Sequence, residues 1–230
     1  MYVLAIDTSG AALSVALLEN KVIRAELFLN TGMNHSIHLL PAVKYVYERA
    51  GLKTDAADFL VCTIGPGSFT GLRIGVGTIK GLAMATGKPV VGVSSLEVLA
   101  ANVFSTSLHI CPMLDAQRGQ VYTAVYKMDD DCLPICIGME RVVDVELFLN
   151  ELTERTIFLG SGAIKYAQSI KRIVPEMSIL VPEQFCHNRA AVAGILGIKR
   201  FHEGNILDAL AFAPHYLRPS EAENKVQKEG

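Results

Sequence analysis

The chain has 230 residues and a formal net charge of −2; 50% of its residues are hydrophobic and only 19% are charged. A chain without surplus cations is a poor autonomous binder of nucleic acid, because that affinity comes largely from cations that neutralise phosphates, and no stretch approaches the ~20 apolar residues of a membrane span. The opening residues, Met1 to Asp7, lack the basic start of a secretory signal, so we expect a cytoplasmic protein, part of whose weakly charged surface is covered by a partner.

The first half of the chain is expected to alternate strands with helices. Apolar runs and turn residues predict strands at 2–6, 13–18, 21–28, 59–64 and 90–93, and helices at 34–50, 68–86 and 94–101. Asn34 and Ser68 are suited to cap the first two helices, and Gly51 and Gly87 are suited to end them. Pro41 lies inside the first helical pattern and predicts a kink or a late start.

The second half repeats the start of the first. A strand that ends in Asp7 is followed by a polar turn and a returning strand, and the same order recurs around Asp115. Strands are expected at 109–114, 120–126 and 157–159, and helices at 145–152, 163–173 and 189–202. We therefore predict two pseudo-repeated α/β lobes with mixed sheets. Residues 1–103 form the first lobe, 104–220 form a smaller second lobe whose C-terminal segment packs back on the first, and 221–230 form a disordered polar tail.

Two turns are candidates for nucleotide contacts. In the first, an acid at a strand end is followed by small hydroxyls, which is how actin-like ATPases hold a cation and phosphates; an Asx-turn that closes the hairpin is the alternative. The second turn runs from a strand through glycines into a helix, where backbone can approach a phosphate, but an ordinary strand-to-helix connection has the same pattern. The candidate residues are Asp7, Thr8, Ser9, Gly160, Ser161 and Gly162.

The glycine-rich segment from Gly65 to Gly77 carries no phosphate-loop signature, because Lys80 is followed by glycine rather than Ser or Thr. Read as a helix, it has two faces. One face holds Gly71, Gly75, Thr78, Gly81 and Ala85, and an apolar face holds Leu72, Val76, Ile79 and Ala83. Interior glycines cost about 1 kcal/mol each relative to alanine, so close approach by another element must offset them. We interpret the glycine face as an interaction face; packing on the chain's own sheet is the alternative.

A histidine pair, His35 and His38, shares one face of the first expected helix. Such a pair could ligate a metal, with Asp208 as a distant third ligand by residue type only. Without a nearby carboxylate, a structural role is the better interpretation. We therefore predict no metal site.

Several segments, in order along most of the chain, resemble one family. They are the segments 4–9 (Leu-Ala-Ile-Asp-Thr-Ser), 35–41, 65–73 (Gly-Pro-Gly-Ser-Phe-Thr-Gly-Leu-Arg), 92–96, 115–122 and 216–218, whereas residues 128–200 match loosely. With these residues the chain resembles the TsaB (YeaZ) family, the bacterial tRNA threonylcarbamoyladenosine biosynthesis subunits that are grouped with the M22 glycoprotease-like proteins.

The resemblance implies an α/β fold of the actin-like (ASKHA, ribonuclease H-like) duplicated class. It also implies a non-catalytic scaffold that pairs with TsaD, a catalytic paralogue, and works with TsaE, an ATPase. Together these transfer a threonylcarbamoyl group to the adenosine beside the anticodon of ANN-reading tRNAs. The implied partners are thus TsaD-like and TsaE-like proteins, tRNA through the complex, and a second copy of the chain when it is alone; ATP and Mg²⁺ belong only to the complex.

The resemblance places the partner face on the helices expected at 34–50 and 68–86. The candidate interface residues are His35, Leu39, Val43, Gly71, Arg73, Gly75, Thr78 and Leu82, and Arg73→Glu or Gly75→Leu is expected to break association without unfolding the chain. The catalytic paralogue has an H-x-x-x-H metal pair, but His35 and His38 stand three apart, which implies a pseudo-enzyme without catalytic residues. The alternatives are an ATP-dependent kinase or ATPase of the same fold, and an M22-type metal-dependent hydrolase.

Overall fold

The computed structural model describes residues 1–32 and 34–218. Its first sheet has the order β3-β2-β1-β4-β5, in which an antiparallel meander is followed by two parallel strands. These strands are β1 (Tyr2–Asp7), β2 (Leu13–Glu19), β3 (Val22–Leu29), β4 (Phe59–Gly65) and β5 (Val90–Ser94). The helices of this half are α1 (His35–Ala50), α2 (Phe69–Thr86) and α3 (Ser95–Ala100).

The second sheet repeats this topology. Its path β10-β7-β6-β11-β12 matches β3-β2-β1-β4-β5 strand for strand, and β8 and β9 pair at its side. The strands are β6 (His109–Asp115), β7 (Gln120–Thr123), β8 (Tyr126–Met128), β9 (Pro134–Cys136), β10 (Arg141–Asp144), β11 (Thr156–Leu159) and β12 (Ser178–Leu180). The helices are α4 (Val145–Glu151), α5 (Ser161–Lys165), α6 (Ala167–Ile173), the short 3-10 turn Glu183–Phe185, and α7 (Ala190–His202). This is the duplicated actin-like fold that the sequence led us to expect.

The capping residues act where the sequence placed them. Asn34 accepts a hydrogen bond from the Ser36 N–H, and Ser68 accepts one from the Gly71 N–H. Gly51 and Gly87 end α1 and α2 in the left-handed conformation that glycine adopts at least cost. The helix α1 begins at His35 and continues through Pro41, so the expected late start does not occur.

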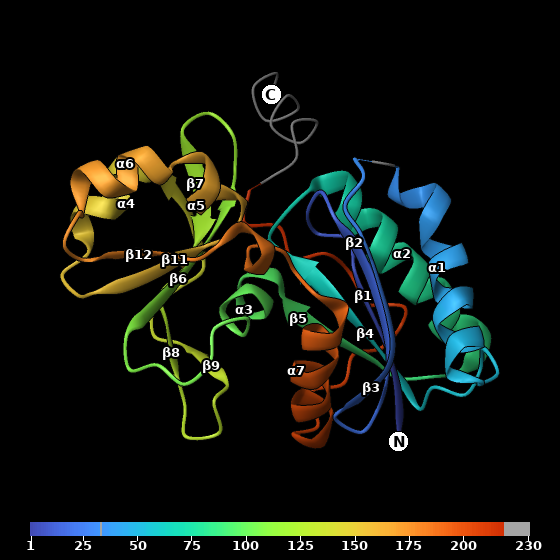
Figure 1. Ribbon diagram of the computed structural model, residues 1–230. Coiled ribbons are helices and arrows are strands. Elements are labelled where there is room, and N and C mark those ends of the chain that lie inside the picture. Colours follow the sequence, from blue (N-terminus) through green and yellow to red (C-terminus); the bar gives the residue numbers. More distant parts are fainter. Residues whose placement is uncertain (33, 219–230) are drawn as a thin grey trace.

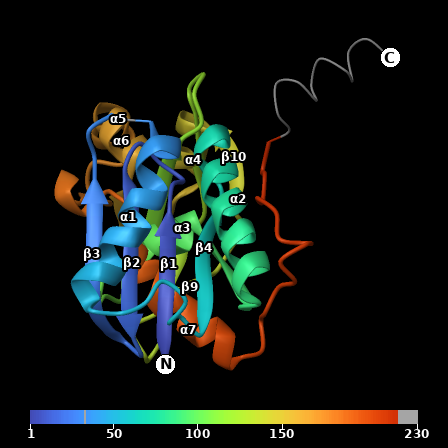
Figure 2. The same ribbon diagram turned by 90° about the vertical axis from the view of Figure 1, so that its right-hand side faces the viewer.

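The last helix of the second half crosses to the first lobe, and the last helix of the first half lies between the two sheets (Figure 1). Helix α7 packs on β1 and β2 of the first sheet, whereas α3 packs on β6 of the second. Helices α1 and α2 lie side by side over the opposite face of the first sheet (Figure 2). Alternate residues of β1 therefore enter two cores: Leu4 and Ile6 face α1 and α2, and Val3 and Ala5 face α7.

The second half departs from the sequence expectation in its short elements. The strand expected at 120–126 is two strands, β7 and β8, and the helix expected at 163–173 is two helices, α5 and α6. The strands β9, β10 and β12 were not expected. Each has only three or four residues, too few for a two-residue alternation to stand out from chance.

Candidate functional site

The carboxyl end of β1 carries the first candidate turn, and its acid is enclosed by the chain itself. Asp7 is 1% exposed. Its carboxylate accepts hydrogen bonds from Ser9, at 2.9 Å from the hydroxyl and 3.2 Å from the backbone N–H, and one from the Asn188 amide at 3.2 Å. Burial raises the pKa of Asp7, and the hydrogen bonds from Ser9 and Asn188 oppose that rise. Asp7 is therefore held by internal partners and turned away from solvent.

The next residue, Thr8, contacts the glycine face of α2. The Thr8 hydroxyl donates to the Gly71 carbonyl at 2.7 Å, and the Ser68 N–H donates to the Ser9 carbonyl at 2.7 Å. A Cβ on Gly71 would collide with the Thr8 carbonyl oxygen, and one on Gly75 would collide with the Thr8 hydroxyl. The helix crosses the end of β1 at this point, so only glycine fits.

This arrangement corrects the interpretation of Gly71 and Gly75 as interface residues. Both are buried against the chain's own sheet, which was the alternative reading, and Gly75→Leu would disturb the fold before it tested association. Gly77 and Gly81, by contrast, have open space where a Cβ would lie. The glycines of one helix therefore have two different environments, which spacing alone did not distinguish.

The matching acid of the second lobe, Asp115, lies at the end of β6. It receives the Lys165 ammonium at 2.7 Å and the Gln117 side-chain amide at 3.0 Å, and its own N–H donates to the Ser161 hydroxyl at 3.1 Å. The two glycines of this turn, Gly160 and Gly162, pack against the Met113 carbonyl of β6. Their small size thus serves the contact between the turn and the neighbouring strand.

A cleft of about 510 Å³ lies between the two strand ends. It brings together two of the candidate nucleotide contacts, Ser9 and Ser161. The buried side chains of Asp7 and Thr8 are not part of its surface. Its other walls come from residues that were not among the candidate nucleotide contacts, namely Gly10, Ala11, Gly67, Ser68, Phe69, Leu114, Asp115, Ala116, Gln117 and Tyr122. The motif at 65–73 was the available signal for Gly67, Ser68 and Phe69; nothing in the sequence marked Asn188, which lies 181 positions from its partner Asp7.

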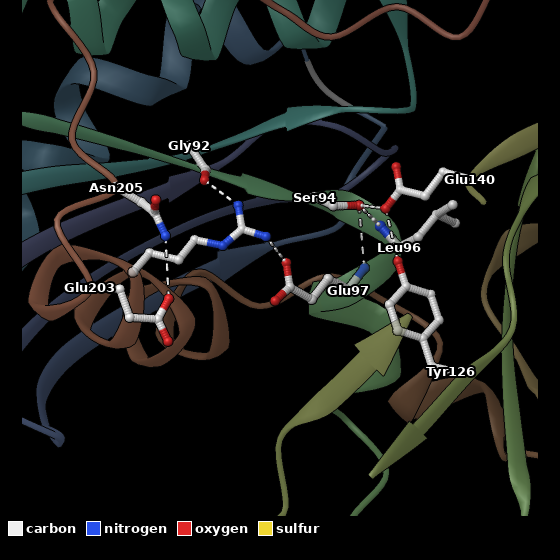
Figure 3. Close-up of polar contacts among 9 residues, drawn as sticks. Gly92, Ser94, Leu96, Glu97, Tyr126, Glu140, Glu203 and Asn205 are labelled. Carbon is white, nitrogen blue, oxygen red and sulfur yellow. Dashed lines mark hydrogen bonds and ion pairs between the residues drawn. The ribbon is translucent and has the colours of Figure 1, made fainter. Parts of the chain in front are cut away.

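A set of polar contacts around α3 joins the two lobes (Figure 3). Glu140 accepts hydrogen bonds from the Ser94 hydroxyl at the start of α3 and from the Tyr126 hydroxyl of β8, at 2.8 Å for Tyr126. On the same helix Glu97 pairs with Arg200 of α7, whose guanidinium also donates to the Gly92 carbonyl. Burial raises the pKa of Glu97, and the Arg200 charge opposes that rise. These contacts connect β5, α3 and α7 with the second sheet.

The candidate interface residues of α1 and α2 differ in how deeply they are buried. Leu39 and Val43 are buried in the core, and Leu82 and Thr78 are half-buried. Arg73 is exposed, lies 4.0 Å from the Phe69 ring centre and donates to the Tyr216 hydroxyl at 3.2 Å. His35 is half-buried, and its Nε2 lies 2.9 Å from the Gly10 carbonyl oxygen. The buried positions Leu39 and Val43 are thus core residues in this chain.

Four large apolar side chains on these two helices are exposed instead: Ile37 (64%), Leu40 (57%), Tyr45 (43%) and Met84 (61%). None of these four residues was among the interface residues expected from the sequence. We call Ile37, Leu40, Tyr45 and Met84 the outer apolar set. An apolar cavity of about 210 Å³ opens between the same two helices.

The histidine pair shows no ligand partners in the part of the chain that the structure describes. His38 is half-buried, and His35 contacts a backbone carbonyl. Over residues 1–32 and 34–218, no group of three or more His, Cys, Asp or Glu side chains is placed to hold a metal ion. Within the same ranges, no helix is both long and apolar enough to cross a membrane.

The duplicated fold, with its paired strand-end acids and the cleft between them, defines the class: this is an actin-like protein built from two ribonuclease H-like lobes. Residues 30–225 match the family described as TsaD, tRNA N6-adenosine threonylcarbamoyltransferase. A crystal structure of a Pseudomonas aeruginosa protein with similarity to the peptidase YeaZ has 26% identity and a TM-score of 0.81, and the match covers 94% of this chain and 99% of that one.

Curated relatives narrow the assignment. The tRNA threonylcarbamoyladenosine biosynthesis protein TsaB of Bacillus subtilis is 34% identical over 98% of this chain and 97% of its own length. Its Escherichia coli counterpart is 29% identical over 98% of both chains. The chain belongs to the TsaB (YeaZ) family.

Proposed function

We propose that the chain is a non-catalytic subunit in the biosynthesis of threonylcarbamoyladenosine in tRNA, and that it acts in the cytoplasm by binding a TsaD-like catalytic paralogue. The names of the relatives support the assignment to this pathway. The observation that carries the role is the outer apolar set on α1 and α2, where two helices of an otherwise well-covered sheet leave large apolar side chains to solvent. Exposed apolar side chains clustered on one surface mark protein interfaces.

The chain's match to the TsaD family supports this choice of partner. A paralogue with the same fold has helices that correspond to α1 and α2, so two like faces can meet as a four-helix interface. The same reasoning permits a homodimer of the isolated chain. Because the interface is formed between helices of the first lobe, the cleft and the second lobe remain available for TsaE-like and tRNA partners.

The cleft supports a non-catalytic role. Asp7 is enclosed by Ser9 and Asn188, and Asp115 is paired with Lys165. A Mg²⁺–nucleotide at this position would have to displace these internal partners, so residual nucleotide binding by Ser9, Gly160, Ser161 and Gly162 is proposed only for the assembled complex. For the isolated chain we propose no cofactor.

The test is binding of the purified TsaD-like paralogue to the full chain by calorimetry. Ile37→Glu with Leu40→Glu places two charges in the outer apolar set and is expected to abolish binding. Leu147→Glu is the matched control, because Leu147 is 65% exposed on α4 of the second lobe. Equal binding by the wild-type chain and the double variant would overturn the proposal.

A further inference from the structure

The cavity between α1 and α2 opens at the surface and reaches down to the core of the first lobe. Its floor consists of side chains that are almost fully buried, Leu4 and Tyr47 at 1% exposure, Leu60 at 3% and Val43 at 5%. Its rim consists of Leu40 and Lys44 on α1, Leu82 and Thr86 on α2, Lys88 just after α2, and Thr54 and Asp55 in the loop after α1, and the buried Ala57 also lines it. The cavity therefore reaches from the sheet to the outer apolar set.

Such a gap is unusual in a packed interior. Protein cores have few voids larger than a water molecule. This cavity opens to solvent at its rim and, at about 210 Å³, is far larger than the space that a single water needs. Of the four floor residues only Tyr47 carries a polar side-chain group, and a buried water needs two to four polar partners. The cavity is therefore better suited to an apolar group from outside than to solvent.

The rim indicates the chemistry beside that group. Lys44 lies on α1, 3.7 Å from Glu48 of the same helix, and Lys88 follows the glycine that ends α2. Among the described residues, no ion pair is formed by Lys88. Asp55 is the single acid on the rim. The surplus of positive charge favours an acidic residue next to the inserted apolar side chain.

We infer that this cavity, the α1–α2 cavity, is the anchor pocket of the partner interface. It receives one large apolar side chain, Leu, Met or Phe, from a helix of the TsaD-like paralogue, and a carboxylate within one turn of that side chain pairs with Lys88. The inference rests on the proposed function. It specifies which part of the interface contributes most of the binding free energy of the paralogue. Interface hot spots are apolar anchors in desolvated pockets surrounded by a ring of weaker contacts, and Leu40 joins the cavity to the exposed Ile37.

The test fills the cavity from inside. Leu82→Phe and, independently, Thr86→Met add apolar volume at two rim positions of α2. Each is expected to keep or raise the thermal midpoint of the chain, because it fills a void, and to weaken binding of the paralogue at least tenfold. Leu147→Phe in the second lobe is the control for added bulk. A contact that merely supported the fold would lose stability and affinity together.

The charge at the rim is tested separately. Lys88→Glu is expected to weaken binding at least fivefold at low salt and less at high salt, whereas Lys53→Glu, in the adjoining loop and outside the rim, is the matched control. If both filled variants bind the paralogue with full affinity, the anchor pocket is overturned. The proposed function still stands in that case, provided that the wild-type chain binds the paralogue. If the filled variants dissociate a homodimer but bind the paralogue normally, the occupant is a second copy and the inference is likewise overturned. Failure of the wild-type chain to bind the paralogue refutes the proposed function itself.

Discussion

Two surfaces of the first lobe, the carboxyl end of β1 and the face formed by α1 and α2, differ in how completely the chain covers them. At the carboxyl end of β1, Asp7, Thr8 and Ser9 are covered by the chain's own groups, down to glycines in α2 that let the helix touch Thr8. Across the same sheet, α1 and α2 leave a cavity of about 210 Å³ open above Leu4 and Leu60. At the strand end the acid is enclosed by the chain although a cleft lies beside it, whereas the helical face keeps an open apolar cavity.

The difference shows that the two surfaces of one lobe differ in how completely the chain's own residues cover them. At the strand end, Asn188 donates a hydrogen bond to Asp7 from far along the chain, and glycines in α2 let that helix contact Thr8. The open face required only that large apolar residues stand at solvent-facing helical positions. The predictions that follow test how firmly each surface is built.

The largest effect is expected where the closed end is tightest. Gly75→Leu should destabilise the chain by about 3 kcal/mol or more, because its side chain would overlap the Thr8 hydroxyl in a packed core. The measurement is the free energy of unfolding in urea. Gly77→Leu, on the same helix with open space at its Cβ, is the control and should cost far less. Similar losses at both positions would refute the contrast between the two glycine environments.

The polar contacts between the lobes come next in size. Glu140→Ala removes the acceptor shared by Ser94 and Tyr126 and should cost about 1–3 kcal/mol, because a buried donor is left without a partner. Tyr126→Phe, which removes one of the two contacts, should cost less. Hydrogen exchange of β8 and α3 reports whether the lobes loosen together. Unchanged stability in Glu140→Ala would show that these contacts do not hold the lobes.

The buried acid gives a pH signature. Because burial raises the pKa of Asp7, the folded chain retains a proton that the unfolded chain releases above its ordinary pKa of 3.8. This contribution to stability is full below pH 3.8 and is lost as the pH rises through the folded pKa, at up to about 1.4 kcal/mol per pH unit. Asp7→Asn should flatten that part of the stability profile. A wild-type profile that Asp7→Asn leaves unchanged would mean that Asp7 is ionised in the fold.

The smallest effect is a gain. Gly77→Ala and Gly81→Ala should each stabilise the chain by up to about 1 kcal/mol, since alanine is the better helix former and nothing lies within 4 Å of either new Cβ. The thermal midpoint reports the change. If either substitution also weakens binding of the paralogue, that glycine belongs to the partner surface.

Much of the architecture could be predicted because local signals agreed with the fold. Helices α1 and α2 begin and end at the capping residues that the sequence predicted, Asn34, Ser68, Gly51 and Gly87. The acids Asp7 and Asp115 indicated the duplication. The site was harder to predict. Helical spacing cannot say whether Gly75 faces a partner or Thr8, because that depends on where the helix crosses the sheet. Nor can it find Asn188, whose approach to Asp7 depends on α7 crossing from the second half to the first lobe.

The central claim is that the chain acts through its helical face and not through its closed strand end. The most direct measurement is reconstituted tRNA modification with the TsaD-like and TsaE-like proteins, threonylcarbamoyl-adenylate and an ANN-reading tRNA, with the chain added or omitted. The account predicts that modification requires the chain, persists with Asp7→Asn and is lost with Ile37→Glu and Leu40→Glu. Modification that proceeds equally without the chain, or that Asp7→Asn alone abolishes while the double variant stays active, would contradict it.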